Sequence, residues 1–381
     1  MRRLVVLCSA IVAMDTIFFA ALTPLLPHYV DEFGLSKTSA GVLVATYGVG
    51  ALLAALPAGL VASRLGPKRA ALTGLCVVAA ASVGFALAAS EWQLDLARLF
   101  QGAGSVFSWS GALAWLVADA PRERRGELLG TAMGSAVFGA LLGPVVGAIA
   151  SVAGVRPTFA GVAALALVLA GFAAATPGAA PETQPLSEVR QAFRDGALLT
   201  GVWLVVLPAL LFGVLIVLVS LKLHGHGWGG VAIGALFLGV TALEVALNPM
   251  LGRFTDRAGR MRPVRAALIA SIGVSVGLAL TTDPAGLVVL TFAAGLAYGA
   301  FYTPALAIVS DSAERLRLAQ GLAFGIMNAG WAVGAVTGPA AGGKLADLAG
   351  DSLPYLLLAG ICLATLLAVR ARRVVPVSAR A

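Results

Sequence analysis

Two short stretches of this sequence repeat one another and decide how the chain folds. Residues 59–67 read GLVASRLGP, and residues 252–260 read GRFTDRAGR. Two glycines and one arginine recur at matching places, 193 positions apart. Two more pairs follow in the same order at nearly the same spacing: GALAWLVAD (111–119) with TPALAIVSD (303–311), and GPVVGA (143–148) with GPAAGG (338–343). This pattern predicts that the chain is a duplication of one unit.

The repeated unit is predicted to consist of membrane-spanning helices. Of the 381 residues, 59% are hydrophobic and only 12% are charged, about half the charged share of a soluble domain. A helix needs about 20 apolar residues to cross the hydrocarbon core. The chain contains about twelve such stretches: 4–26, 40–62, 70–90, 93–118, 128–152, 157–176, 197–221, 230–251, 264–282, 286–310, 320–345 and 353–370. We therefore expect an all-α integral membrane protein with two pseudo-symmetric six-helix bundles.

The duplication divides the chain into four parts: an N-terminal bundle (1–176), a cytoplasmic linker (177–196), a C-terminal bundle (197–370) and a cytoplasmic tail (371–381). The first part of the linker is proline-rich, which favours an irregular chain. Its second part places Leu186, Val189 and Phe193 at helical spacing, which favours a short helix on the inner membrane surface. A solvated loop is nearly as consistent with this pattern.

The net charge of +8 reflects membrane topology. Arginine and lysine gather in alternate loops, for example at Arg64 and Lys68 and at Arg122 and Arg125, whereas the intervening loops hold few. Positively charged loops stay in the cytoplasm. We therefore expect a multi-pass protein of the cell membrane with both termini cytoplasmic, and no nucleic-acid partner.

Several segments resemble signatures of the major facilitator superfamily, and the resemblance covers essentially the whole chain. GLVASRLGPKR (59–69) and GRFTDRAGR resemble its repeated loop, and RLFQGAG (98–104) resembles its fourth span. GALLGPVVG (139–147) is similar to the fifth-span signature of exporters, which indicates the twelve-span drug:proton antiporter branch. MDTIFFAALTPLLPHYV (14–30) resembles the first span of vesicular amine transporters, where an aspartate occupies this place.

This resemblance implies a transporter that works by alternating access and exports a small amphipathic, cationic compound in exchange for protons, as in multidrug or amine efflux. It implies a monomer in the lipid bilayer that needs no cofactor, because a proton gradient drives it. Two alternatives stay open: a proton-coupled importer of a small metabolite on the same fold, and a non-transporting membrane sensor. The sequence contains no GxxxxGK[ST] and no HExxH, so nothing in it indicates an enzyme.

Asp15 is the principal candidate for proton coupling and substrate binding. It lies in an apolar span, where low dielectric disfavours an ionised carboxyl, and acids inside the membrane are functional by default. A carboxyl that accepts either a proton or a cation is the simplest exchanger. Phe18 and Phe19 lie three and four residues on, hence on the same helix face, and aromatic rings beside a carboxylate suit a cation with an apolar body. The alternative is a structural carboxyl bonded to a neighbouring helix.

Two further charged residues lie inside predicted spans. Arg98 follows Asp95 by three residues, a spacing at which the two side chains can pair. The resemblance implies a role for Arg98 in proton coupling, and a self-neutralising ion pair is the equal alternative. Glu244 is the other deep acid. Because Asn248 lies one turn further on, a structural polar contact is favoured over a second proton site.

Two groups of residues are expected to control the conformational change. Glycines at four-residue spacing form a packing groove, and a proline can bend the helix, which would seal the cavity against proton leak: Gly139, Gly143, Pro144 and Gly147. The resemblance implies that charged residues near the repeated loops balance the two states: Arg64, Asp119, Asp256 and Arg257. Ser63 replaces the acidic residue of the family's first loop, which predicts a weaker lock there.

Polar and aromatic residues of the fourth, tenth and eleventh spans are candidates for lining the substrate pocket: Trp109, Trp115, Tyr298, Tyr302, Asn328 and Trp331. For each aromatic residue, helix packing is an equally good explanation. The histidines His28, His224 and His226 lie in or next to predicted outer loops. A solvated loop is favoured there over a metal site, so no metal is expected.

Overall fold

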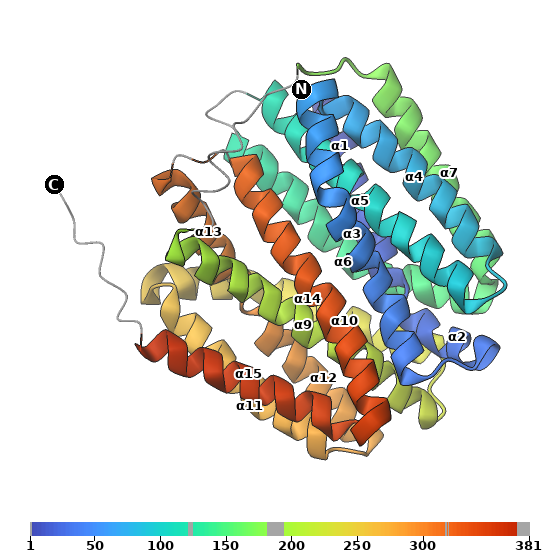
Figure 1. Ribbon diagram of the computed structural model, residues 1–381, viewed down its shortest axis with the longest axis vertical. Helices are drawn as coiled ribbons and strands as arrows, with labels where there is room; N and C mark the ends of the chain where they lie inside the picture. The colour runs from blue at the N-terminus through green and yellow to red at the C-terminus, as the bar shows by residue number, and fades with distance from the viewer. Residues whose placement is uncertain (1, 121–124, 181–193, 317, 319, 372–381) are drawn as a thin grey trace.

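The structure, a computed structural model, describes residues 2–120, 125–180, 194–316, 318 and 320–371 (Figure 1). Every regular element within these ranges is helical, which confirms the all-α fold. The surface helix predicted around Leu186, Val189 and Phe193 lies outside the described residues, and so does the tail from residue 372 onward.

The first half of the chain forms six helical segments of membrane length. The first segment is discontinuous and consists of α1 (Arg2–Ala21), η1 (Thr23–Leu25) and α2 (Leu26–Phe33). The other five are α3 (Lys37–Leu65), α4 (Pro67–Leu87), α5 (Glu91–Asp119), α6 (Arg125–Ala153) and α7 (Val155–Ala175).

The second half repeats this arrangement. Its segments are α9 (Gly196–Gly225), α10 (Gly230–Ala258), α11 (Met261–Leu280), the interrupted pair α12 (Pro284–Gly299) and α13 (Tyr302–Arg315), α14 (Gln320–Ala349) and α15 (Ser352–Ala371). Among the described residues, ten segments are long and apolar enough to cross a membrane. The remaining two helices of comparable length, α5 and α14, have 29 and 30 residues.

The repeated loops are explained by backbone geometry. Gly66 and Gly259 are the matching glycines of the two stretches, and their φ angles are 96° and 77°. Residues other than glycine rarely adopt such φ angles, because their Cβ atom would clash with the backbone. The same tight connection therefore joins α3 to α4 and α10 to α11, and only glycine fits at its corner.

The glycines of α6 bring its backbone into contact with α1. A Cβ atom added to Gly139, Gly143 or Gly147 would lie less than 3.0 Å from atoms of α1. These neighbours include the carbonyl oxygens of Ala13 and Ala21, which cannot move aside as a flexible side chain could. Pro144 lies inside the same helix and its carbonyl approaches Gly234 of α10, so α6 lies between α1 and the second half.

The same packing recurs in the second half. A Cβ atom at Gly334 or Gly338 of α14 would lie less than 3.0 Å from the backbone of α9. Another face of α14 meets α3 of the first half, where Gly41 lies against the carbonyl of Pro339 and Gly343 against the carbonyl of Lys37. The GPAAGG stretch is therefore the structural counterpart of GPVVGA, and small residues make both approaches possible.

Polar contacts between the described residues of the two halves gather at the end of the molecule away from the N-terminus. We call three of these contacts the interhalf latch: Lys37 with Asp351, Thr38 with Asp347, and His224 with Asp31, at 2.5, 2.6 and 2.9 Å. At the opposite end, Arg260–Asp311 and Arg315–Asp195 each stay within the second half. In Figure 1 the two halves accordingly diverge toward the termini and approach at the other end.

We predict that Gly139→Ala lowers the thermal stability of the protein. The new methyl group meets the Ala13 carbonyl, and such overpacking costs about 1–3 kcal/mol. The matched control is Gly171→Ala on α7, where a Cβ atom meets nothing within 4 Å. Thermal unfolding of both purified variants in detergent measures the difference. Equal melting temperatures would contradict tight α1–α6 packing.

We predict that Asp351→Asn weakens the interhalf latch and shifts the protein toward the state that is open at that end. Lys37 and Lys222 both approach the Asp351 carboxylate, at 2.5 and 3.9 Å. Pairs near the surface contribute about 0.5–1 kcal/mol, a two- to fivefold change in population. Pulsed electron paramagnetic resonance between spin labels at positions 32 and 282, with the native cysteines replaced, would report longer distances. Glu91→Gln, at the same end, is the control and leaves the distances unchanged.

Candidate functional site

Asp15 lies near the middle of the first span and is completely enclosed by the first half. Only 2% of its surface is exposed. The Ser108 hydroxyl of α5 donates a hydrogen bond to Oδ2 of Asp15 at 2.5 Å, whereas Oδ1 has no hydrogen-bond partner. A buried carboxyl with one unsatisfied oxygen is costly unless a proton or a cation arrives. One oxygen of the Asp15 carboxyl is therefore left without a partner among the described residues.

Arg98 lies close by on α5 and is 1% exposed. Its Nη1 atom donates to Oε1 of Gln101 at 3.2 Å and to the carbonyl of Phe18 at 3.4 Å, and its guanidinium lies 4.8 Å from the centre of the Tyr47 ring. The predicted pair with Asp95 does not form, because the guanidinium turns inward toward Tyr47 of α3. Its Nε atom and the Gln101 Nε2 atom have no partners, so donors remain available at this site.

Phe19 links this site to the second half. Its ring lies 5.1 Å from Tyr47 and 5.0 Å from Trp331 of α14, measured between ring centres. The Trp331 indole in turn lies close to the Tyr302 hydroxyl. We call Tyr47, Phe19, Trp331 and Tyr302 the aromatic bridge. It runs from below the Arg98 guanidinium, across the boundary between the halves, to the first residue of α13.

Glu244 of α10 lies at the far end of the aromatic bridge. Its carboxyl is half-buried and lies against Gly299, at the point where α12 ends. It interacts electrostatically with Tyr302. The structure gives it no hydrogen bond to Asn248, so the polar contact that the sequence favoured does not form between these described residues.

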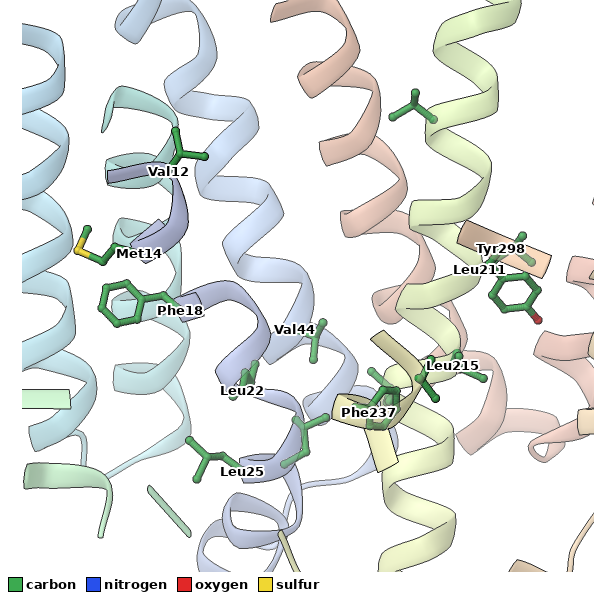
Figure 2. Close-up of a cluster of buried hydrophobic side chains, with 14 of the residues drawn as sticks. Val12, Met14, Phe18, Leu22, Leu25, Val44, Leu211, Leu215, Phe237 and Tyr298 are labelled. Carbon is green, nitrogen blue, oxygen red and sulfur yellow. The ribbon is translucent and has the colours of Figure 1, made fainter. Parts of the chain in front are cut away.

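Three of the predicted pocket residues belong to the packed core instead. Phe18 stacks on Phe159 of α7 and lines an apolar groove of about 250 Å³ between α1, α6 and α7. Trp115 and Tyr298 have no exposed surface, and the Tyr298 hydroxyl bonds to Ser275 at 3.1 Å. Figure 2 shows Phe18 and Tyr298 among buried apolar side chains. Trp109 and Asn328 are half-buried, as are Tyr302 and Trp331.

The structure describes the side chains of three of the four loop residues expected to balance the two states. Arg64, Asp119 and Arg257 are exposed, and no ion pair joins them to one another in the described structure; the side chain of Asp256 lies outside the described residues. Instead, Arg260 pairs with Asp311 and donates to the Ala307 carbonyl at 2.9 Å. Asp311 ends the TPALAIVSD repeat, so the sequence held a signal for this pair.

Several residues of the site were absent from the sequence prediction. Ser108, Gln101 and Tyr47 contact Asp15 or Arg98, yet each is common in packed helices and only the fold brings them together. His224 was expected in a solvated loop but reaches across the halves to Asp31. Its position beside an outer loop was visible in the sequence, whereas its partner in the other half was not.

Comparison with known proteins agrees with this geometry. The family model described as Major Facilitator Superfamily matches residues 6–316 and 210–381. The chain is 23% identical over 371 residues to the uncharacterized MFS-type transporter YcaD of Escherichia coli O7:K1, covering 94% of this chain and 93% of that protein. It is 30% identical over 138 residues to the probable vesicular acetylcholine transporter-B of Danio rerio, covering 35% of this chain but only 27% of that protein.

The fold also matches a solved transporter. The crystal structure of a D-xylose–proton symporter superimposes with a TM-score of 0.77 at 15% identity, covering 96% of each chain. At this identity the likeness shows the fold alone. With the family model spanning nearly the whole sequence, it follows that the chain belongs to the Major Facilitator Superfamily and is a secondary active membrane transporter, not an enzyme.

Proposed function

We propose that this transporter is a proton-coupled antiporter that exports small amphipathic cations. The observation that carries the proposal is the buried Asp15 carboxyl, held by Ser108 on one oxygen and by nothing on the other. In a region of low dielectric, a single proton changes the electrostatics of such a group strongly. Protonated Asp15 is neutral and leaves the positive charge of Arg98 unbalanced, whereas ionised Asp15 balances that charge.

Arg98 would make the site respond to that proton. Both Asp15 and Arg98 act electrostatically on Tyr47, so they face the same small region between α1, α3 and α5. When Asp15 is ionised, the two buried charges balance one another. When it is protonated, one buried positive charge remains and disfavours a bound cation. This alternation would prevent the proton and the substrate from being bound at the same time, as antiport requires.

The packing of α6 helps to close one end of the transporter. The halves are closed at the end away from the termini, and α6 helps to close them because it lies between α1 and α10. With the termini in the cytoplasm, as the charged loops predict, this state would admit substrate from the cytoplasm. We propose that the protein acts as a monomer in the cell membrane, driven by the proton gradient alone.

The comparisons bear on the substrate in two ways. One partial relative is named as a probable vesicular acetylcholine transporter, and acetylcholine is a quaternary ammonium cation. The fold is shared with a D-xylose–proton symporter, so import of a neutral metabolite is the competing function. Asp15 could carry the proton in either function, so the aromatic rings of Tyr47, Phe19 and Trp331 are what favour an organic cation over a sugar.

We predict that Asp15→Asn abolishes proton-driven uptake of organic cations into inside-out membrane vesicles that are acidic inside. Wild-type vesicles should accumulate fluorescent or radiolabelled cations and ignore sugars. The amide keeps the shape of the side chain but cannot ionise, so a loss would reflect the lost charge. Glu314→Gln, an exposed position on α13, is the control and retains uptake.

Two results would contradict the proposal in different ways. Uptake that survives Asp15→Asn would move proton coupling to another residue. Proton-coupled sugar uptake in the opposite direction, with no cation transport, would identify the importer.

A further inference from the structure

The second half contains a carboxylate that its own fold leaves without a partner. Glu244 lies within α10, inside the membrane, and the described residues give its carboxyl neither a hydrogen bond nor an ion pair. A charged group in such a place is costly unless it is paired. A ligand that supplies the missing positive charge would remove this cost.

The backbone around Glu244 makes room for its carboxyl. A Cβ atom at Gly299 would lie 2.5 Å from Oε1 of Glu244, so only glycine allows the carboxyl to stay where it is. Gly299 is also the last residue of α12, and two residues separate it from the start of α13. Interrupted helices in transporters mark binding sites, because they place backbone groups next to the ligand.

Aromatic side chains lie near this carboxylate. Tyr302 and Trp331 of the second half are half-buried and lie close to one another, and the ring centre of Phe19 from the first half lies 5.0 Å from that of Trp331. A carboxylate together with aromatic faces is the arrangement that binds an organic cation with an apolar body. Because the rings come from both halves, a cation held here would contact both.

Asp15 differs from Glu244 in the respects that matter for binding. Asp15 is 2% exposed and bonded to Ser108, so it has room for a proton but none for a bulky cation. Glu244 is half-buried and bonded to nothing in the described structure. The aromatic bridge lies between the two sites, with Tyr47 near Asp15 and Tyr302 near Glu244.

We propose that the two carboxylates divide the work of the transporter: Glu244, with Tyr302 and Trp331, holds the charged head of the exported cation, and Asp15 holds the transported proton. This inference rests on the proposed cation antiport and deepens it. The substrate class that fits is a quaternary or otherwise permanently charged cation with aromatic groups, because such a cation uses both the carboxylate and the rings.

The test compares two ligands of similar shape and different charge on the purified full-length protein. Tetraphenylphosphonium is a permanent cation, and triphenylphosphine oxide is neutral. We expect Glu244→Gln to weaken tetraphenylphosphonium binding at least tenfold and to leave triphenylphosphine oxide binding within twofold of the wild type. Gly299→Ala keeps the charge of Glu244 but displaces its carboxyl, so it should also weaken binding of the cation and leave binding of the neutral ligand unchanged. Glu314→Gln is the matched control.

Asp15→Asn separates the two roles. It should abolish gradient-driven uptake while weakening tetraphenylphosphonium binding less than Glu244→Gln does. The opposite order would place the cation on Asp15 and overturn the division of work, yet leave the antiporter intact. Loss of both ligands in Glu244→Gln would show a structural role for Glu244 and also overturn the inference. If the wild type neither binds nor transports any cation, the proposed function fails together with the inference.

Discussion

The backbones of α6 and α1 touch along Gly139, Gly143 and Gly147, and α14 and α9 touch in the same manner in the second half. Lipid provides no hydrophobic force between helices. The dispersion contacts that such close approach allows therefore have to hold each bundle together. α1 carries Asp15 and Phe19, and α14 carries Trp331. The two glycine-lined contacts therefore fix the helices from which the site is built.

Within this frame, the polar residues fall into two kinds. Some are satisfied by neighbours in the same half, such as Tyr298 with Ser275 and Arg260 with Asp311. Others keep an unsatisfied atom inside the membrane, such as Oδ1 of Asp15 and Nε of Arg98. Buried polar groups are otherwise paired almost without exception. Other unpartnered polar atoms are scattered through the described structure, but Asp15, Arg98 and Gln101 lie together beside Tyr47 at one end of the aromatic bridge.

Much of the fold could be predicted from the sequence, because span length, hydropathy and the internal repeat are properties of the chain itself. The contact faces of Gly139 and Gly143 were also predictable, since four-residue spacing defines a helix face. The direction in which each side chain points could not be predicted from the sequence. Phe18 and Phe19 are neighbours in sequence, yet one packs on α7 and the other crosses to α14. Arg98 prefers Tyr47 on another helix to Asp95 on its own, a choice that depends on tertiary packing.

The interhalf latch has a consequence that follows from its position at the rim of the molecule. Two of its charged side chains are well exposed to solvent: Lys37 is 36% exposed and Asp31 is 68% exposed. Charges in water are screened over about 8–10 Å at physiological ionic strength, and the Debye length shortens as salt rises. The ionic strength of the medium on one face of the membrane would thus bias which face the substrate site opens to, without any change in substrate or proton concentration.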